Sequence, residues 1–179
     1  IRLAFSSSYW PLIWPTPYVA RITLFPEKTQ LVLPWRHAGP PEDAKVFHTD
    51  RDSETQAPKA QIDGAPLTRW SQHDVMSNSI TSGWHQPFTR IAFDEIAVEY
   101  AFETKAKHQI TLDDPNSACS EFEHKLQFKR SGSIVEVLGT ARLKSSPTDY
   151  HVFGTLEVWE DGALICERQW RPVIPRNHS

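Results

Sequence analysis

The chain has 179 residues, a formal charge of -3, 39% hydrophobic residues and 14 prolines. This length is enough for one ordinary domain or two small ones with a real core. The mildly acidic balance excludes the broad basic field that attracts nucleic acid or an acidic membrane surface, and no apolar run approaches the roughly 18 residues of a membrane helix. We therefore expect neither nucleic acid nor a membrane among the partners of the chain.

Residues 1–36 contain three runs with the composition of strands: Ile1–Phe5, Tyr18–Phe25 and Thr29–Pro34. The last two flank a turn at Pro26–Lys28, so they are predicted to form a hairpin. The first run starts at the first residue and has no lysines or bulges to protect a free edge. The sequence therefore predicts that a strand from an upstream segment, or from a second protomer, lies beside it.

Residues 37–90 have the composition of a loop, with many prolines, glycines and small polar side chains. Two short patches, 44–48 and 67–73, are predicted to be ordered, the second as an edge strand. A loop of this length typically connects two subdomains. We therefore interpret 37–90 as an irregular linker with short ordered patches.

Residues 91–179 are the most regular part of the chain, because apolar and polar side chains alternate with a period of two. A first strand is expected from Phe93 through Phe102. Further strands are expected at His108–Leu112, Glu121–Arg130, Ser133–Lys144, Asp149–Glu160 and Ala163–Arg171. Within Asp149–Glu160, one face is expected to point to the core, and it consists of Tyr150, Val152, Gly154, Leu156 and Val158.

The connections between these strands have the chemistry of tight turns. Asp161-Gly162 is a strong hairpin signal, and Ser131-Gly132 is a second turn of this kind. The best helix candidate is a single turn after Asp114, with Pro115 at its first position. The sequence thus predicts an all-β protein: the end of one sheet domain in 1–36, then an antiparallel β-meander in 91–179 that forms a curved sheet or partial barrel.

Catalytic motifs are missing from the sequence. There is no nucleophile elbow, phosphate-binding glycine loop, zinc-protease motif or dinucleotide fingerprint, and the eight histidines are scattered singly. Asp113-Asp114 is either an acid/base pair or a turn that ends a strand, and His151 with Asp149 is either a catalytic pair or a pair on a sheet surface; the second interpretation is favoured in both cases. We expect no catalytic residue, no metal and no cofactor in this chain.

The two cysteines, Cys119 and Cys166, do not form a CxxC motif or the framework of a secreted disulfide-rich domain. They are expected to be reduced, as is typical of a cytoplasmic protein.

The most promising functional candidates are three aromatic residues in a proline-rich segment: Tyr9, Trp10 and Trp14. Tryptophan and tyrosine combine flat apolar faces with a polar edge, and the prolines at 11, 15 and 17 restrict the backbone around them. The three rings are therefore expected either to plug an interface between domains or to form one wall of a substrate pocket in a neighbouring domain.

Several segments resemble the carboxyl-terminal region of CocE/NonD-type hydrolases, the family of X-Pro dipeptidyl-peptidases and cocaine esterase. They are Ile1–Ala4 with Ser7–Pro17, Leu31–Arg36, Asp114–Ala118, Thr148–Val152 and Arg168–Arg176. The resemblance implies a parent protein in which an α/β-hydrolase domain with a Ser-His-Asp triad precedes a jelly roll of the galactose-binding-like type. Residues 1–36 would then be the last strands of the jelly roll. The catalytic domain lies outside this chain, so no triad residue is carried over.

We therefore expect a non-catalytic β portion of a serine hydrolase that cleaves esters or amides. It would pack on the upstream α/β-hydrolase domain, help to shape the substrate pocket, and take part in a homo-oligomer. The alternative is a free-standing β module that binds carbohydrate or a small apolar ligand.

Overall fold

The computed structural model describes residues 3–19, 21–34 and 59–176. Within these residues, nine strands form one antiparallel sheet, which confirms the predicted all-β class. The strands are β1 (Gln61–Gly64), β2 (Thr68–Asp74), β3 (Ser79–Phe93), β4 (Val98–Thr111), β5 (Asp114–Arg130), β6 (Ser133–Ser145), β7 (Asp149–Glu160), β8 (Ala163–Trp170) and β9 (Val173–Pro175). Two short 3-10 helices, η1 (Pro26–Lys28) and η2 (Asp94–Ile96), complete the described elements, and neither has the length or the apolar content to cross a membrane.

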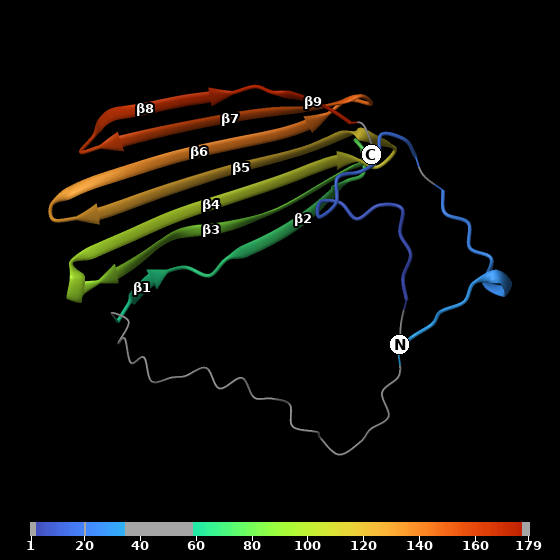
Figure 1. The fold of residues 1–179 in the computed structure, drawn as a ribbon, viewed down its shortest axis with the longest axis horizontal. Coiled ribbons are helices and arrows are strands. Elements are labelled where there is room, and N and C mark those ends of the chain that lie inside the picture. Colours follow the sequence, from blue (N-terminus) through green and yellow to red (C-terminus); the bar gives the residue numbers. More distant parts are fainter. Residues whose placement is uncertain (1–2, 20, 35–58, 177–179) are drawn as a thin grey trace, which may run out of the picture. The chain divides into compact units, whose positions relative to one another are not determined.

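The central strands follow one another in space as they do in sequence, so the sheet is a meander from β3 to β8 (Figure 1). At one side β1 and β2 both pair with β3, and at the other β8 and β9 both pair with β7. The outermost strands do not pair with each other, so the described sheet is open. It belongs to a compact unit made of residues 1–21 and 58–179, whereas residues 22–57 form a second unit.

Two hairpin turns confirm the predictions made from their sequences. Between β5 and β6, Ser131 and Gly132 both have positive φ angles, 51° and 87°. Between β7 and β8, Asp161 and Gly162 do as well, at 49° and 81°. Two successive residues with positive φ define a type I′ turn, whose twist matches that of the flanking strands. These turns bring β6 and β8 directly back beside β5 and β7.

The single strand expected from Phe93 through Phe102 is in fact the end of β3 and the start of β4, joined by a tight turn. η2 ends β3, and Ala97 then takes a left-handed conformation with φ of 50°, so that Phe93 pairs with Val98 across the turn. The alternation continues through the turn because both flanking strands have the same period of two. Periodicity alone therefore did not locate this chain reversal.

The helical turn expected after Asp114 is also wrong, because β5 starts at that residue. The Asp114 carboxylate accepts a hydrogen bond from the Asn116 backbone N–H at 2.9 Å, as a capping residue would, but no helix follows. Pro115 is accommodated at the beginning of the strand, a position where its missing N–H does little harm.

The segment interpreted as an irregular linker contains much of one side of the sheet. β1, β2 and most of β3 lie within residues 61–90, and the edge strand predicted at 67–73 corresponds to β2. β3 includes a bulge between Gln86 and Thr89, where Pro87 interrupts the ladder. Pro87 is thus accommodated at a bulge, and Pro66 lies between β1 and β2. The patch predicted at 44–48 lies outside the described residues.

The strands expected in residues 1–36 are not present in the part that the structure describes. Leu3–Phe5 and the residues on either side of η1 belong to no described strand, and their apolar side chains are exposed. The turn at η1 does form, closed by hydrogen bonds from Lys28 N to Phe25 O and from Thr29 N to Pro26 O. An isolated hairpin is only marginally stable, so strand-forming residues without a neighbouring sheet have no ladder to join.

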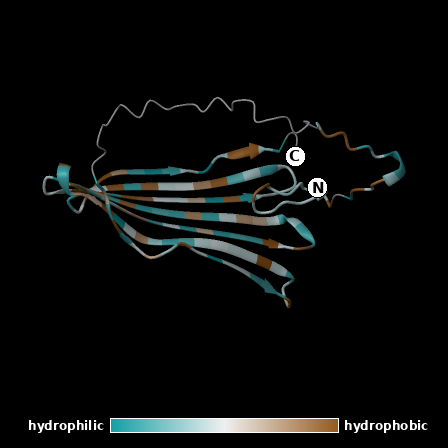
Figure 2. Cartoon of the chain, turned by 90° about the horizontal axis from the view of Figure 1, so that it is seen from below, coloured by the Kyte–Doolittle hydropathy of each residue, from teal (hydrophilic) through white to brown (hydrophobic). Residues whose placement is uncertain are grey.

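The two faces of the sheet differ sharply in polarity. Residues directly opposite one another on neighbouring strands share a face, and alternate residues along a strand change face. The register therefore assigns to one face, here called the apolar face, Trp84, Tyr100, Phe102, Phe122, Leu126, Phe128, Val135, Val137, Leu143, Tyr150, Val152, Leu156, Val158 and Trp170. The opposite, polar face has mainly charged residues and threonines, and Figure 2 shows the resulting bands of hydropathy along the strands.

The predicted inward face of β7 is confirmed in register but not in burial. Its side chains lie on the apolar face together with those of the neighbouring strands, yet each remains half-exposed. Among the described residues, the buried apolar side chains are four alanines, Ile110 and the prolines at 15 and 17, and no large side chain is fully buried. The described sheet is one layer, and a core needs a second layer to cover the apolar face.

Two strand glycines with different surroundings test this packing. A Cβ atom at Gly83 would lie 2.4 Å from the Ala106 carbonyl oxygen and 2.8 Å from the Trp70 ring, whereas at Gly139 the nearest atom is 3.9 Å away. We expect Gly83→Ala to destabilise the chain by about 1–3 kcal/mol, because the ladder and the ring must shift, and Gly139→Ala to be neutral or slightly stabilising. Urea unfolding of both variants measures the difference, and equal effects would contradict the register described here.

Candidate functional site

The tryptophans of the proline-rich segment pack on one end of the apolar face. The Trp10 and Trp14 rings meet edge to face, with centroids 5.0 Å apart. Trp10 also stands edge-on to His108 of β4, at 6.1 Å, and Trp14 edge-on to Tyr150 of β7, at 6.0 Å. Trp14 Nε1 donates a hydrogen bond of 2.9 Å to Ser145 Oγ at the end of β6. The segment therefore contacts three strands of the sheet.

Tyr9, the third predicted site residue, does not join this cluster. Its side chain is exposed, and its backbone carbonyl accepts a hydrogen bond from Ile13 N at 2.9 Å that closes the turn between the tryptophans. The Trp10 indole N–H is shielded from solvent and has no hydrogen-bond partner among the described residues. The structure thus brings Trp10 and Trp14 together as packing residues, while a role for Tyr9 in a neighbouring pocket stays a prediction.

Arg176 fastens this segment to the sheet from the other end of the chain. Arg176 is 8% exposed, and its guanidinium donates hydrogen bonds to the carbonyl oxygens of Pro15, at 2.6 Å, and Ser146, at 2.9 Å. It also lies 4.8 Å from the centre of the Tyr150 ring, in a cation–π contact. Asn116 adds a hydrogen bond from its side-chain amide to Pro17 O at 3.1 Å. We call this group of Trp10, Trp14, Tyr150 and Arg176 the aromatic clasp.

The polar face has a cross-strand network of charges centred on Glu103 of β4. The Glu103 carboxylate lies 2.8 Å from His85 Nε2 and 3.0 Å from Lys105 Nζ, and Lys105 also approaches Glu123 at 3.4 Å. The hydrogen bonds from His85 and then Lys105 lower the pKa of the Glu103 carboxyl. The same contact raises the pKa of Lys105. The network holds charged side chains in fixed positions across β3, β4 and β5.

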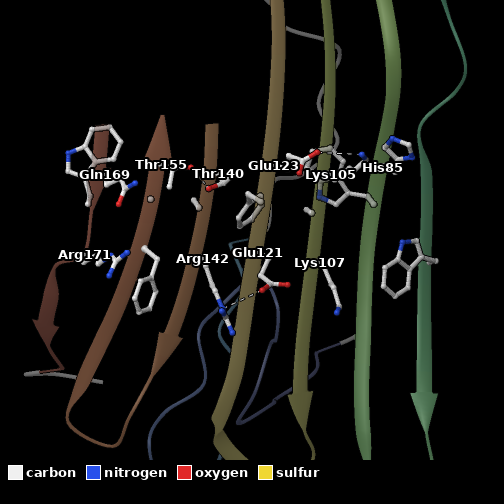
Figure 3. Close-up of a pocket in the computed structure, with 18 residues that line it drawn as sticks. His85, Lys105, Lys107, Glu121, Glu123, Thr140, Arg142, Thr155, Gln169 and Arg171 are labelled. Carbon is white, nitrogen blue, oxygen red and sulfur yellow. Dashed lines mark hydrogen bonds and ion pairs between the residues drawn. The ribbon is translucent and has the colours of Figure 1, made fainter. Parts of the chain in front are cut away.

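A groove of about 650 Å³ lies beside this network (Figure 3). One row of residues in direct register crosses it, one from each of six strands: Trp70, Gly83, Lys107, Glu121, Arg142 and Phe153. Arg142 Nε pairs with Glu121 at 3.3 Å, the dashed contact in Figure 3. The row therefore has an aromatic ring at each end and charged groups between them.

The carboxylates considered as acid/base candidates serve turns instead. Asp113 accepts a hydrogen bond from Asn78 Nδ2 at 2.7 Å, and Asp114 closes the turn onto Asn116. Asp149 bonds to Thr148, and no hydrogen bond joins it to His151 in the described part of the chain. No group of three or more His, Cys, Asp or Glu residues able to hold a metal occurs within residues 3–19, 21–34 and 59–176.

Sequence reasoning missed both the partners of the clasp and the groove. Arg176 and Pro15 are separated by 161 positions, so no local pattern relates them. The groove row could have been found in part, since the period of two assigns a face to each residue of a strand. It does not give the register between strands, and the register decides which of those residues lie side by side.

Removing the Arg176 guanidinium should open the aromatic clasp. Arg176→Met keeps the length of the side chain but leaves the carbonyl oxygens of Pro15 and Ser146 without their charged donor, so we expect a loss of roughly 2 kcal/mol or more. Arg130→Met, at an exposed position, should change stability by less than about 0.5 kcal/mol. Thermal unfolding measures both variants, and an equal effect of the two would show that Arg176 does not anchor the segment.

The clasp should also weaken in mild acid through His108. Burial lowers the pKa of this imidazole below its usual 6.5, because the charged form loses solvation between the Trp10 and Phe122 rings. The unfolded chain then binds the proton more readily than the folded chain, so the contribution to stability is complete above pH 6.5 and falls as the pH drops below it. We expect His108→Gln to flatten the stability profile between pH 7 and 5, and His73→Gln, at an exposed position, to leave the slope unchanged.

Comparison with known proteins adds no relative: no family model, no curated protein and no solved structure matches this chain. The resemblance to the carboxyl-terminal region of CocE/NonD-type hydrolases therefore depends on the sequence segments that suggested it. What the geometry itself provides is a one-layer sheet with an apolar face, a clasp at one end of that face, and a groove on the polar face.

Proposed function

We propose that this chain is a non-catalytic β portion of a cytoplasmic serine hydrolase that cleaves esters or amides, as in the X-Pro dipeptidyl-peptidase family. In this role the sheet packs through its apolar face against a neighbouring part of the enzyme, such as the rest of a jelly roll or the α/β-hydrolase domain. The aromatic clasp fixes the proline-rich segment at the rim of that contact, and Tyr9 points outward to help shape the substrate pocket.

The observation that supports this role most is the exposed apolar face. Phe122, Phe128 and Trp170 are each 40–48% exposed on it, and exposed apolar patches of this extent mark interaction surfaces. Covering one such aromatic side chain contributes about 1.5–3 kcal/mol. A neighbouring layer would therefore supply much of the stability that the sheet lacks by itself.

The residues before the sheet support the same role. Ile22, Leu24, Leu31 and Leu33 alternate as strand residues do, yet they belong to no strand in the described part of the chain and their side chains are exposed. Segments of this kind complete a ladder when a neighbouring strand is supplied. Together with the sequence segments similar to the hydrolase tails, this favours a portion of a larger enzyme over a free-standing module.

The set of domains and polypeptides present in the native protein tests the proposal. We expect material purified with an antibody against this chain to contain a serine hydrolase domain, in the same polypeptide or bound to it, and to hydrolyse p-nitrophenyl acetate. The 179-residue chain alone should be inactive on this ester and on an Ala-Pro anilide. A native species of 20.5 kDa without a bound hydrolase would contradict the proposal.

Two phenylalanines on opposite faces provide a matched pair of variants. Phe122 is 43% exposed on the apolar face, and Phe153 is 42% exposed on the polar face. In the native protein, Phe122→Asp should place a charge in the contact and shorten the thermal half-life of the hydrolase activity at least about fivefold, whereas Phe153→Asp should leave it nearly unchanged. If Phe153→Asp is the more damaging, the enzyme packs on the other face.

A further inference from the structure

We propose that the groove on the polar face binds an acidic oligosaccharide, with Lys107 and Arg171 taking its carboxylates and Trp70 and Phe153 stacking on its sugar rings. This site lies on the face opposite to the one that packs in the proposed function, so it does not depend on that function. It requires only the residues of the sheet itself.

The groove has more cations than carboxylates. Four cations line it, Lys105, Lys107, Arg142 and Arg171, against two carboxylates, Glu121 and Glu123. Lys105 and Arg142 already pair with these carboxylates. Lys107 and Arg171 have no carboxylate partner among the described residues, so the groove has positive charge available for an anionic ligand.

Two exposed aromatic rings lie at the ends of the row that crosses the groove. Trp70 and Phe153 are each 42% exposed, on a face where most of their neighbours are charged. The Trp70 ring lies against Gly83, where an added side chain would collide with it, so the close approach of the ring depends on this glycine. The two rings belong to the same row, five strand spacings apart, which corresponds to about 24 Å. Stacking platforms at both ends suit an elongated ligand with apolar ring faces.

Uncharged polar side chains also line the groove between the two rings. Thr140 and Thr155 present hydroxyls that bond to each other at 2.6 Å, and Gln169 lines the groove beside them (Figure 3). Hydroxyl, amide and carboxylate groups in mixed order can donate to and accept from sugar hydroxyls. A ligand with both hydroxyls and carboxylates, such as a uronic acid chain, matches this set.

Other polymers fit the groove less well. An extended peptide gains most of its affinity by pairing with the edge of a sheet, but the groove crosses strands whose backbone groups are already paired with each other. A nucleic acid presents fewer hydroxyls per unit than a uronic acid does to the Thr140, Thr155 and Gln169 side chains of the groove. A purely apolar ligand would have to desolvate Lys107 and Arg171 without compensation.

Titration calorimetry of the 179-residue chain with hexagalacturonate at low salt tests the site. We expect a dissociation constant of about 1 mM or lower. Lys107→Gln should weaken binding at least about fivefold and Trp70→Leu at least about tenfold, while Lys59→Gln, outside the groove, should have no effect. Should Trp70→Leu fail to fold, the Lys107→Gln result and the shifts of the Lys107, Glu121 and Arg142 amide resonances on titration decide the matter.

The competing ligands are tested in the same experiment. The neutral galactohexaose should bind more weakly than hexagalacturonate, and hexaglutamate and hexauridylate should show no binding that Lys107→Gln reduces. No binding of hexagalacturonate at millimolar concentration would overturn the proposal. Equal binding of the neutral sugar, the peptide or the RNA, or an unchanged affinity in Lys107→Gln, would overturn it as well.

Discussion

The backbone ladder from β3 to β7 is the feature on which the rest of the described structure depends. With nearly no large side chain buried, the strands are held mainly by continuous antiparallel hydrogen bonding and by cross-strand side-chain pairs. The register of this ladder also places most apolar side chains on one face and most charges on the other. A shift by one residue would exchange the two faces. Packing and recognition thus both follow from the same alignment of strands.

The two faces are suited to different tasks because their chemistry differs. The apolar face gains free energy only when another surface excludes water from it, which is the property of an interface within a larger protein. The polar face keeps its ion pairs in water. Two of its cations, Lys107 and Arg171, have no carboxylate partner in the part of the chain that the structure describes. The aromatic clasp lies at the rim of the apolar face, where the tails before and after the sheet meet through Arg176. It therefore joins segments at opposite ends of the sequence to the interface side of the sheet.

Much of the sheet could be predicted from the sequence, for reasons that differ from element to element. β6, β7 and β8 were predictable because Asp161-Gly162 and Ser131-Gly132 allow positive φ angles where two strands must turn. The reversal at Ala97 was not, because alanine gives no turn signal and alternation runs through it. The strands expected before residue 36 were predicted from composition. Residues of this composition form a strand only where a neighbouring strand provides backbone hydrogen bonds. The clasp depends on contacts between remote segments, which no local pattern contains.

The margins of the sheet have a further consequence for how it can assemble. On each side the outermost position is shared by two short strands, β1 with β2 and β8 with β9, and each pair is interrupted by residues outside the ladder. Pro172 falls in one of these interruptions, and Pro66 in the other. Along these two margins of the described sheet, a long strand of another molecule therefore meets no continuous row of free backbone groups with which to pair. This disfavours edge-to-edge association into fibrils. Two such sheets therefore associate more readily by packing face to face than by pairing edge to edge.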